Sequence, residues 1–134
     1  MLKKSILKIF ELKVTGNFSS AHKIRDYKGK CEKLHGHNWK VELIVNSSKL
    51  NKSGLVEDFS KLKKILNEEL KKLDHKYLNN IKPFDKINPT CENIAKYLFD
   101  TLNSQLSTLN SQLFKVTVWE NETQCASYGF AEYE

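Results

Sequence analysis

Long hydrophobic runs and a paired set of cysteines are both missing from this sequence. No stretch of its 134 residues approaches the ~18 consecutive apolar residues that a membrane-spanning helix needs. In the N-terminal segment MLKKSILKIFELKV, charged residues interrupt the apolar ones, whereas a signal peptide would carry an unbroken hydrophobic region. The cysteines are odd in number and widely spaced, which is typical of reduced thiols. They are Cys31, Cys91 and Cys125. We therefore expect a cytoplasmic protein without a membrane partner.

Arginine is also scarce, because Arg25 is the one basic residue among 22 that is not lysine. The formal net charge is +6, and the lysines are spread along the chain without a stripe of basic and aromatic residues. Proteins that read nucleic acids usually rely on arginine for bidentate contacts to bases and phosphates. The composition therefore favours a solvated lysine-rich surface and no nucleic-acid partner, and it is compatible with attraction for a small anionic substrate.

Two segments near the N-terminus alternate apolar and polar residues, as half-buried strands do. The first strand is expected over 6–15, and its alternation continues as far as His22. The second strand is expected over 35–46, with His35 and His37 at the start of its apolar face. The predicted core face of both strands thus carries histidines at one end.

Helical spacing of apolar residues follows the two strands. One helix is expected to begin at Ser60 and another at Thr90, each residue acting as the N-cap. Two last strands are expected over 114–120 and 125–133. The order ββααββ predicts an α+β fold, with a four-stranded antiparallel sheet and two helices on one face. Since the length is typical of one domain and 40% of the residues are apolar, we expect a single domain over 1–134.

The histidines at the strand ends suggest a metal site. Because a strand alternates sides, His35 and His37 project the same way, about 7 Å apart along the chain. His22 has the parity to join them if the two strands pair. Three imidazoles on one zinc ion would leave a coordination position open, as in catalytic sites. Histidines held by ordinary hydrogen bonds are the alternative, but three of the chain's four histidines converge here, which favours a metal.

Cys31 leaves two interpretations open. If Cys31 filled the fourth position of a zinc ion, the site would be closed and structural, although no second cysteine lies nearby to complete the usual clip. A zinc-stabilised basic nucleic-acid-binding module would then be the function, and it would lose its fold with its zinc. If Cys31 is not a ligand, a thiolate close to a metal could act as a base or nucleophile in an enzyme. Cys91 and Cys125 are expected to be small buried hydrophobic residues.

Six short segments carry a family resemblance. They are FSSAH (18–22), CEKLHGHNW (31–39), GLVEDFSKLK (54–63), LDHKYLN (73–79), PTCENIA (89–95) and VTVWE (116–120). In this order, and over nearly the whole chain, they resemble the 6-pyruvoyltetrahydropterin synthase/6-carboxytetrahydropterin synthase family. The resemblance implies the T-fold, in which the sheets of several subunits join around a ring. It also implies a homo-oligomer, commonly a ring of three subunits or a hexamer of two stacked rings.

The resemblance further implies a role for each residue of the histidine-rich segments. His22, His35 and His37 match the family's three zinc ligands. Cys31 matches its catalytic cysteine, which does not bind the metal.

Other matching positions concern proton transfer and the pterin. Asp74 and His75 match the acidic and histidine partners of the proton-transfer machinery. Glu120 matches the carboxylate that anchors the pterin, whose adjacent N–H donors a carboxylate can accept together. Thr90 and Glu92 fall in a segment associated with the pterin pocket.

The substrate that the resemblance implies is 7,8-dihydroneopterin triphosphate. In the carboxy type of enzyme, which serves 7-deazaguanine and queuosine synthesis, three residues separate the cysteine from the HGH element, and in the pyruvoyl type the gap is longer. Here the gap is Glu32-Lys33-Leu34. The resemblance therefore favours formation of 6-carboxy-5,6,7,8-tetrahydropterin with release of acetaldehyde and triphosphate. The alternative is a 6-pyruvoyltetrahydropterin synthase, which eliminates the triphosphate only.

Overall fold

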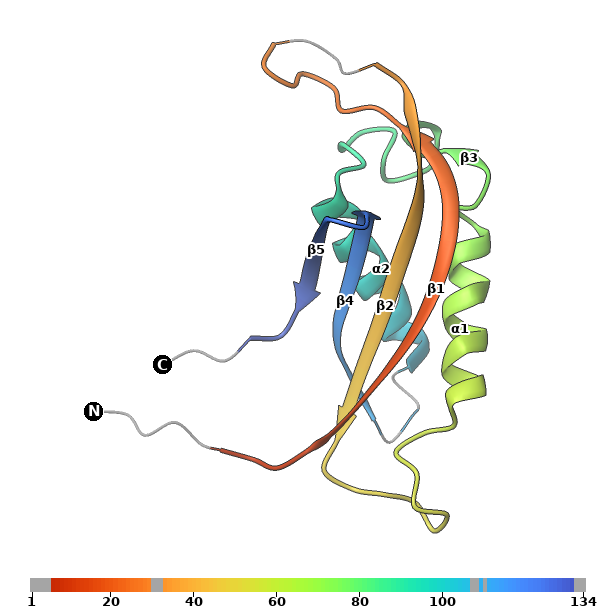
Figure 1. The fold of residues 1–134 in the computed structure, drawn as a ribbon, viewed down its shortest axis with the longest axis vertical. Helices are drawn as coiled ribbons and strands as arrows, with labels where there is room; N and C mark the ends of the chain where they lie inside the picture. The colour runs from red at the N-terminus through yellow and green to blue at the C-terminus, as the bar shows by residue number, and fades with distance from the viewer. Residues whose placement is uncertain (1–5, 30–32, 107–108, 110, 132–134) are drawn as a thin grey trace, which may run out of the picture.

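The computed structural model describes residues 6–29, 33–106, 109 and 111–131. The elements are β1 (Phe10–His22), β2 (His35–Ser47), α1 (Phe59–Lys71), β3 (Lys76–Tyr77), a short 3-10 helix η1 (Leu78–Asn80), α2 (Cys91–Leu106), β4 (Gln112–Asn121) and β5 (Gln124–Gly129). Figure 1 shows β1 and β2 as long curved neighbours, with α1 along one side. None of the described helices is long and apolar enough to cross a bilayer.

The sheet has five strands in the order β3-β1-β2-β4-β5, which corrects the predicted count of four. The four longer strands, β1, β2, β4 and β5, pair antiparallel with one another, as the sequence predicts. The additional strand β3 pairs in parallel with Ser20 and Ala21 of β1. Since β3 contains two residues, it is too short to show an alternating pattern, and only the tertiary fold identifies it as a strand.

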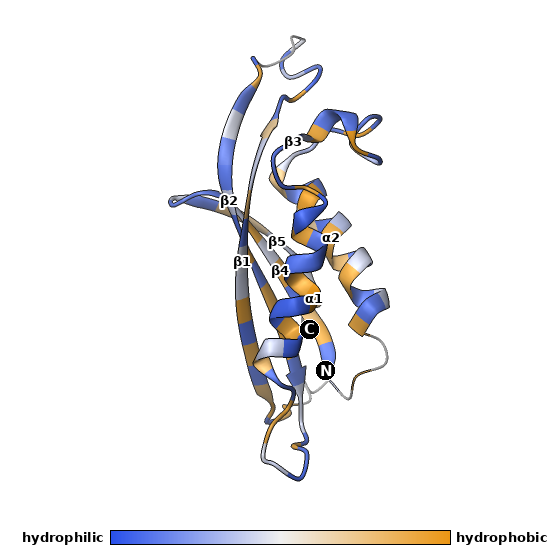
Figure 2. Ribbon diagram, turned by 90° about the vertical axis from the view of Figure 1, so that its right-hand side faces the viewer, coloured by the Kyte–Doolittle hydropathy of each residue, from blue (hydrophilic) through white to orange (hydrophobic). Residues whose placement is uncertain are grey.

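Both helices cover the same face of the sheet, and Figure 2 shows them together on one side of it. The core between the layers is apolar, and the rings of Phe18 and Trp39 stack within it at 5.7 Å between centroids. Helix α1 lies so close to β1 that a Cβ added at Gly16 would come within 2.8 Å of the Leu70 side chain. A glycine at this position therefore permits the contact between helix and strand.

The ends of several elements differ from the prediction. The α1 N-cap is Asp58, not Ser60, because the Asp58 carboxylate accepts a hydrogen bond from the Ser60 N–H at 2.9 Å. The expected strand over 6–15 begins later and runs to His22, because its pairing with β2 continues to the last residue. The final strand ends at Gly129 rather than at 133. These shifts follow from pairing partners and caps, which the local pattern does not specify.

Candidate metal centre

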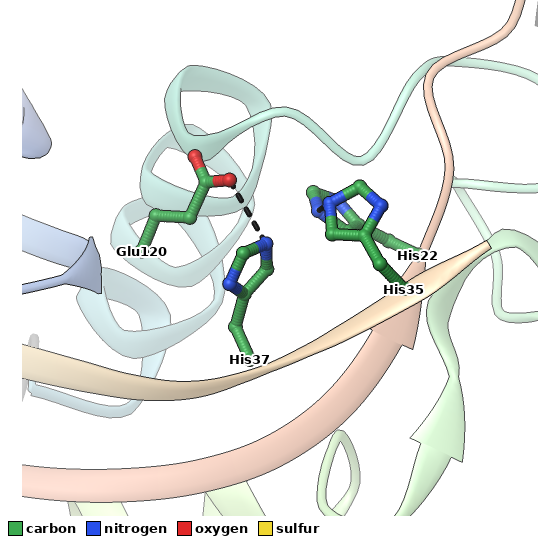
Figure 3. A group of neighbouring side chains, drawn as sticks. All are labelled: His22, His35, His37 and Glu120. Atoms are coloured by element: carbon green, nitrogen blue, oxygen red, sulfur yellow. Dashed lines mark hydrogen bonds and ion pairs between the residues drawn. The ribbon is translucent and has the colours of Figure 1, made fainter. Parts of the chain in front are cut away.

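Three histidines converge where β1 ends and β2 begins. The antiparallel register pairs His22 with His35 and Ser20 with His37, so the three imidazoles share the face that carries the core. The ring centroid of His22 lies 4.6 Å from that of His35 and 5.2 Å from that of His37. This histidine cluster (His22, His35 and His37) is shown in Figure 3.

Two backbone carbonyls orient two of the rings. His22 Nδ1 lies 2.8 Å from the Pro89 carbonyl oxygen, and His35 Nδ1 lies 2.8 Å from the Lys33 carbonyl oxygen. Because a carbonyl only accepts hydrogen bonds, each Nδ1 carries a proton and each Nε2 can present its lone pair. The two Nε2 atoms face each other at 3.1 Å, an approach that two lone pairs disfavour unless a proton or a cation joins them. Metal-binding histidines are typically oriented in this way.

Burial sets the charge state of His22, whose side chain is almost inaccessible to solvent. Burial lowers the pKa of His22 below its ordinary value, and the neighbouring His35 and His37 lower it further, while the Pro89 carbonyl and Glu120 act in the opposite direction. The neutral imidazole is the form that binds a metal. The surroundings of His22 thus favour its metal-binding form.

Glu120 completes the group of potential ligands. Its Oε1 lies 2.9 Å from His37 Nε2 (Figure 3), and one ligand atom from each of the four residues lies within 4.8 Å of all the others. Ligands of a tetrahedral zinc ion stand roughly 3.3 Å apart, so small movements would let all four reach one ion. The four side chains therefore fit a metal. The family resemblance associates Glu120 with a pterin. The sequence signal for its place beside the histidines is that Glu120 shares strand parity with Val116 and Val118.

A pocket of about 650 Å³ opens beside the histidine cluster, a size typical of small-molecule sites. It is lined by Gly36, His37, Asn38, Lys40, Trp119, Glu120, Asn121 and Glu122. The pocket lies where the β2–β4 pairing stops, at Lys40 and Trp119, so that the start of β2 projects past β4. Trp119 is held in place by a hydrogen bond of 3.2 Å from its Nε1 to Glu42 Oε1.

Asp74 and His75 form a hydrogen-bonded pair. His75 Nδ1 lies 2.8 Å from Asp74 Oδ2, and Asp74 Oδ1 accepts the Ser19 N–H at 2.8 Å. The Ser19 N–H and then His75 lower the pKa of Asp74 below its ordinary value. The His75 side chain is 83% exposed. Asp74 lines a second pocket, of about 520 Å³, which shares no lining residue with the pocket beside the histidine cluster.

The remaining predicted site residues lie outside the pocket or outside the described residues. Cys31 belongs to the part of the chain that the structure does not describe. The Thr90 hydroxyl caps α2 by accepting the Asn93 N–H at 3.1 Å, as the sequence predicts for an N-cap. Glu92 is exposed in the first turn of α2, and neither Thr90 nor Glu92 lines the pocket beside the histidine cluster.

The other two cysteines differ from each other. Cys91 is buried, its Sγ donates to the Val118 carbonyl oxygen at 3.0 Å, and burial raises its pKa to about 11. Cys125 is exposed, so the expectation that both thiols are buried is wrong for this one. Its strand β5 lies at the edge of the sheet, where side chains meet solvent.

A loop network that the sequence does not reveal holds the chain just after His22. The Asn88 side chain pairs with both backbone groups of Arg25, each at 2.9 Å, and Asn79 does the same for Lys23 at 3.0 and 2.9 Å. The Arg25 guanidinium donates to the carbonyl oxygens of residues 84, 85 and 87. Because Asn88 precedes Pro89, the network also positions the carbonyl that orients His22.

A three-histidine group next to a pocket of this size could hold a metal beside a bound small molecule. Comparison with known proteins identifies the family of the chain. The family model described as 6-pyruvoyl tetrahydropterin synthase matches residues 11–130, and the chain belongs to this family of pterin enzymes.

Curated relatives within the family carry different names. The chain is 41% identical over 114 residues to a candidate 6-carboxy-5,6,7,8-tetrahydropterin synthase of Archaeoglobus fulgidus, a match that covers 84% of this chain and 90% of that one. It is 34% identical over 119 residues to 6-carboxy-5,6,7,8-tetrahydropterin synthase of Bacillus subtilis, covering 85% and 80%. It is also 37% identical over 106 residues to dihydroneopterin monophosphate aldolase of Pyrococcus furiosus, covering 78% and 83%.

The fold agrees with that of a solved structure in the same family. 6-Pyruvoyl tetrahydropterin synthase of Caenorhabditis elegans superposes with a TM-score of 0.80 at 27% identity, covering 93% of this chain and 98% of that one. The α+β T-fold expected from the resemblance is therefore confirmed, with the fifth short strand as the difference described above.

Proposed function

We propose that the protein is a zinc-dependent 6-carboxy-5,6,7,8-tetrahydropterin synthase. It converts 7,8-dihydroneopterin triphosphate to 6-carboxy-5,6,7,8-tetrahydropterin with release of acetaldehyde and triphosphate, a step of 7-deazaguanine and queuosine synthesis. The observation that carries the proposal is the convergence of His22, His35, His37 and Glu120 beside a pocket of about 650 Å³, in a chain of this family. Two relatives with the carboxy name at 41% and 34% identity support the choice of product.

The histidine cluster would hold the zinc ion. When bound there, zinc supplies a Lewis acid that binds oxygens of the substrate side chain and stabilises negative charge that develops on them. The carbonyls of Pro89 and Lys33 keep the His22 and His35 rings oriented for this task.

The pocket would take the pterin ring. Trp119 offers an aromatic wall, and Glu120 offers a carboxylate that can accept two adjacent N–H donors from the ring. Lys40 also lines the pocket, and its positive charge would favour an anionic substrate. We still propose that Thr90 and Glu92 are associated with the pterin, although neither residue lines this pocket within one chain.

Proton transfer would be the task of Cys31, Asp74 and His75. Cys31 is the proposed base, and His75 the proposed proton donor, oriented by the Asp74 carboxylate 2.8 Å from its Nδ1. Within one chain neither Asp74 nor His75 lines the pocket beside the histidine cluster. We therefore propose a homo-oligomer, a ring of three subunits or a hexamer, in which the pair of one copy can serve the metal site of another.

Two other activities compete with the carboxy assignment. A 6-pyruvoyltetrahydropterin synthase would eliminate triphosphate without releasing an aldehyde. The relative named dihydroneopterin monophosphate aldolase, at 37% identity, favours a second alternative, cleavage of the side chain of a dihydroneopterin monophosphate. The three-residue gap Glu32-Lys33-Leu34 favours the carboxy type over the pyruvoyl type.

One assay separates the three activities. The zinc-loaded protein is incubated in parallel with dihydroneopterin triphosphate and with dihydroneopterin monophosphate, and both pterin and aldehyde products are identified by mass. Acetaldehyde together with 6-carboxytetrahydropterin from the triphosphate supports the proposal. Pyruvoyltetrahydropterin without an aldehyde selects the pyruvoyl type, and a phosphorylated two-carbon aldehyde from the monophosphate selects the aldolase. Absence of turnover with zinc bound contradicts all three.

A further inference from the structure

Glu120 faces two directions at once. Its Oε1 lies 2.9 Å from His37 Nε2, within the group of four potential ligand atoms. Its Oε2 lies 3.4 Å from Gln124 Nε2, at the side of the β4–β5 turn. The side chain is 23% exposed and lines the pocket beside the histidine cluster. The carboxylate therefore forms a boundary between the metal-binding group and the space proposed for the pterin.

Glu120 lies at an irregularity in the pairing of β4 with β5. The β4–β5 register shifts between Trp119, which pairs with Cys125, and Asn121, which pairs with Gln124. Glu120 is the extra residue of this irregularity, and the β2–β4 pairing stops one residue before it. Bulges redirect a side chain and loosen the local ladder, and they are frequent next to active sites. Glu120 is thus placed where a change of direction disturbs few backbone hydrogen bonds.

The two directions exclude each other for one carboxylate. To accept two adjacent N–H donors from a pterin, both oxygens must point into the pocket. To bind a metal held by the histidine cluster, Oε1 must stay beside His37. We propose that Glu120 is the fourth metal ligand of the substrate-free protein, and that a bound pterin ring withdraws it and opens one coordination position to the substrate side chain. This inference extends the proposed function, in which Glu120 only anchors the pterin.

Ligand exchange of this kind couples metal binding to pterin binding in a predictable direction. A pterin without a side chain takes Glu120 away and returns no ligand, so it weakens zinc binding. A pterin with a hydroxylated side chain, such as neopterin, supplies oxygens in exchange, so it leaves zinc affinity near its starting value. By linkage, zinc must weaken the binding of unsubstituted pterin by the same factor.

The first experiment needs no pterin. Zinc affinity is measured by competition with a chromophoric chelator for the wild-type protein and for Glu120→Gln, with Glu122→Gln as the matched control. Glu122 lines the same pocket but is not in the group of four, so its substitution removes the same charge without removing a ligand. We expect Glu120→Gln to weaken zinc binding by about tenfold or more and Glu122→Gln to leave it unchanged. Thermal melting shows that each variant is folded.

The second experiment adds a pterin to the same titration, with the fluorescence of the pterin reporting its binding. In the wild-type protein, unsubstituted pterin should weaken zinc binding to about the level of Glu120→Gln, whereas neopterin should not. In Glu120→Gln, unsubstituted pterin should leave zinc affinity unchanged, because no carboxylate ligand remains to be withdrawn. Wild-type zinc affinity in Glu120→Gln, or bound unsubstituted pterin that leaves the zinc affinity of the wild-type protein unchanged, overturns the proposal. Neither experiment measures turnover, so failure of the proposed reaction is detected separately by the aldehyde assay.

Discussion

The histidine cluster and the Asp74–His75 pair are built in opposite ways. The cluster takes its rings from two long paired strands, and backbone carbonyls fix two of the three rings. The pair stands between α1 and the two-residue strand β3, with His75 83% exposed and at a positive φ of 54°. The strand register brings the three histidine rings of the first site together within one chain. The second is an exposed hydrogen-bonded pair that a neighbouring molecule can approach.

This difference indicates that the two sites have different tasks in the proposed enzyme, metal binding and proton transfer. Ligands of a metal must hold their positions to within tenths of an ångström, which paired strands and buried rings provide. A proton donor has to reach the substrate only at one stage, and exposure at an element end permits this. The two sites should therefore fail in different ways when they are altered.

Loss of a ligand should have the largest effect. We expect His35→Ala to weaken zinc binding by more than the ~10–100-fold that loss of an outer partner of a ligand costs, and to abolish turnover. The side chain is only partly buried, so the variant should remain folded. Zinc content after dialysis and a chelator titration measure the effect. Retention of stoichiometric zinc by His35→Ala would show that His35 is not a metal ligand.

Loss of the exposed His75 side chain should reduce turnover without changing zinc binding. His75→Ala is expected to lower kcat by ~10²–10⁴-fold, the usual contribution of a general acid or base, with zinc affinity unchanged. Steady-state kinetics and the same chelator titration test this contrast. If the pair serves another copy, mixing inactive His75→Ala with inactive Cys31→Ala under exchange conditions should restore part of the activity. Loss of zinc from His75→Ala would show that the Asp74–His75 pair also supports metal binding, so that the two sites are not independent.

The loop network behind His22 should have a smaller effect on the metal. Asn88→Ala removes the pairing with Arg25 next to the Pro89 carbonyl, so we expect zinc affinity to fall by about tenfold, the lower limit for an outer partner. Asn51→Ala serves as the control, because the Asn51 side chain also makes two hydrogen bonds to the backbone, accepting the Ser53 and Leu55 N–H groups at 2.9 and 3.0 Å in a loop outside the site. Equal zinc affinities of the two variants would show that the Asn88 network does not support the metal.

The smallest expected effect is on stability at low pH, to which His22 and Asp74 should contribute in different pH ranges. In the metal-free protein the pKa of His22 lies below its ordinary value of 6.5, so the unfolded chain binds more protons and stability falls as pH decreases below about 6.5. The pKa of Asp74 is lowered from 3.8, so its contribution is lost only in stronger acid, as pH falls through that lowered pKa. Melting temperatures between pH 7.5 and 5.5 in a chelator should fall less for His22→Gln than for the wild type. Asp74→Asn should keep the wild-type slope in this range.

Prediction from the sequence succeeded where a pattern is local and repeated. The alternation over 35–46 gave the direction of His35 and His37, because a slip of one residue would turn an entire apolar face to water. It failed for β3, which is too short for any pattern, and for the start of α1, where Asp58 and Ser60 are both acceptable N-caps. It also missed the Arg25 and Asn88 contacts, which join segments more than sixty residues apart.

The sequence by itself determined the family, the α+β order of the long elements and the common face of the three histidines. Each of these follows from residue types at fixed spacings along the chain. Only the tertiary structure decided that Glu120 lies 2.9 Å from His37 and that neither Asp74 nor His75 lines their pocket. Such contacts depend on where strand pairing stops and where a register shifts, and those features result from the packing of the whole sheet.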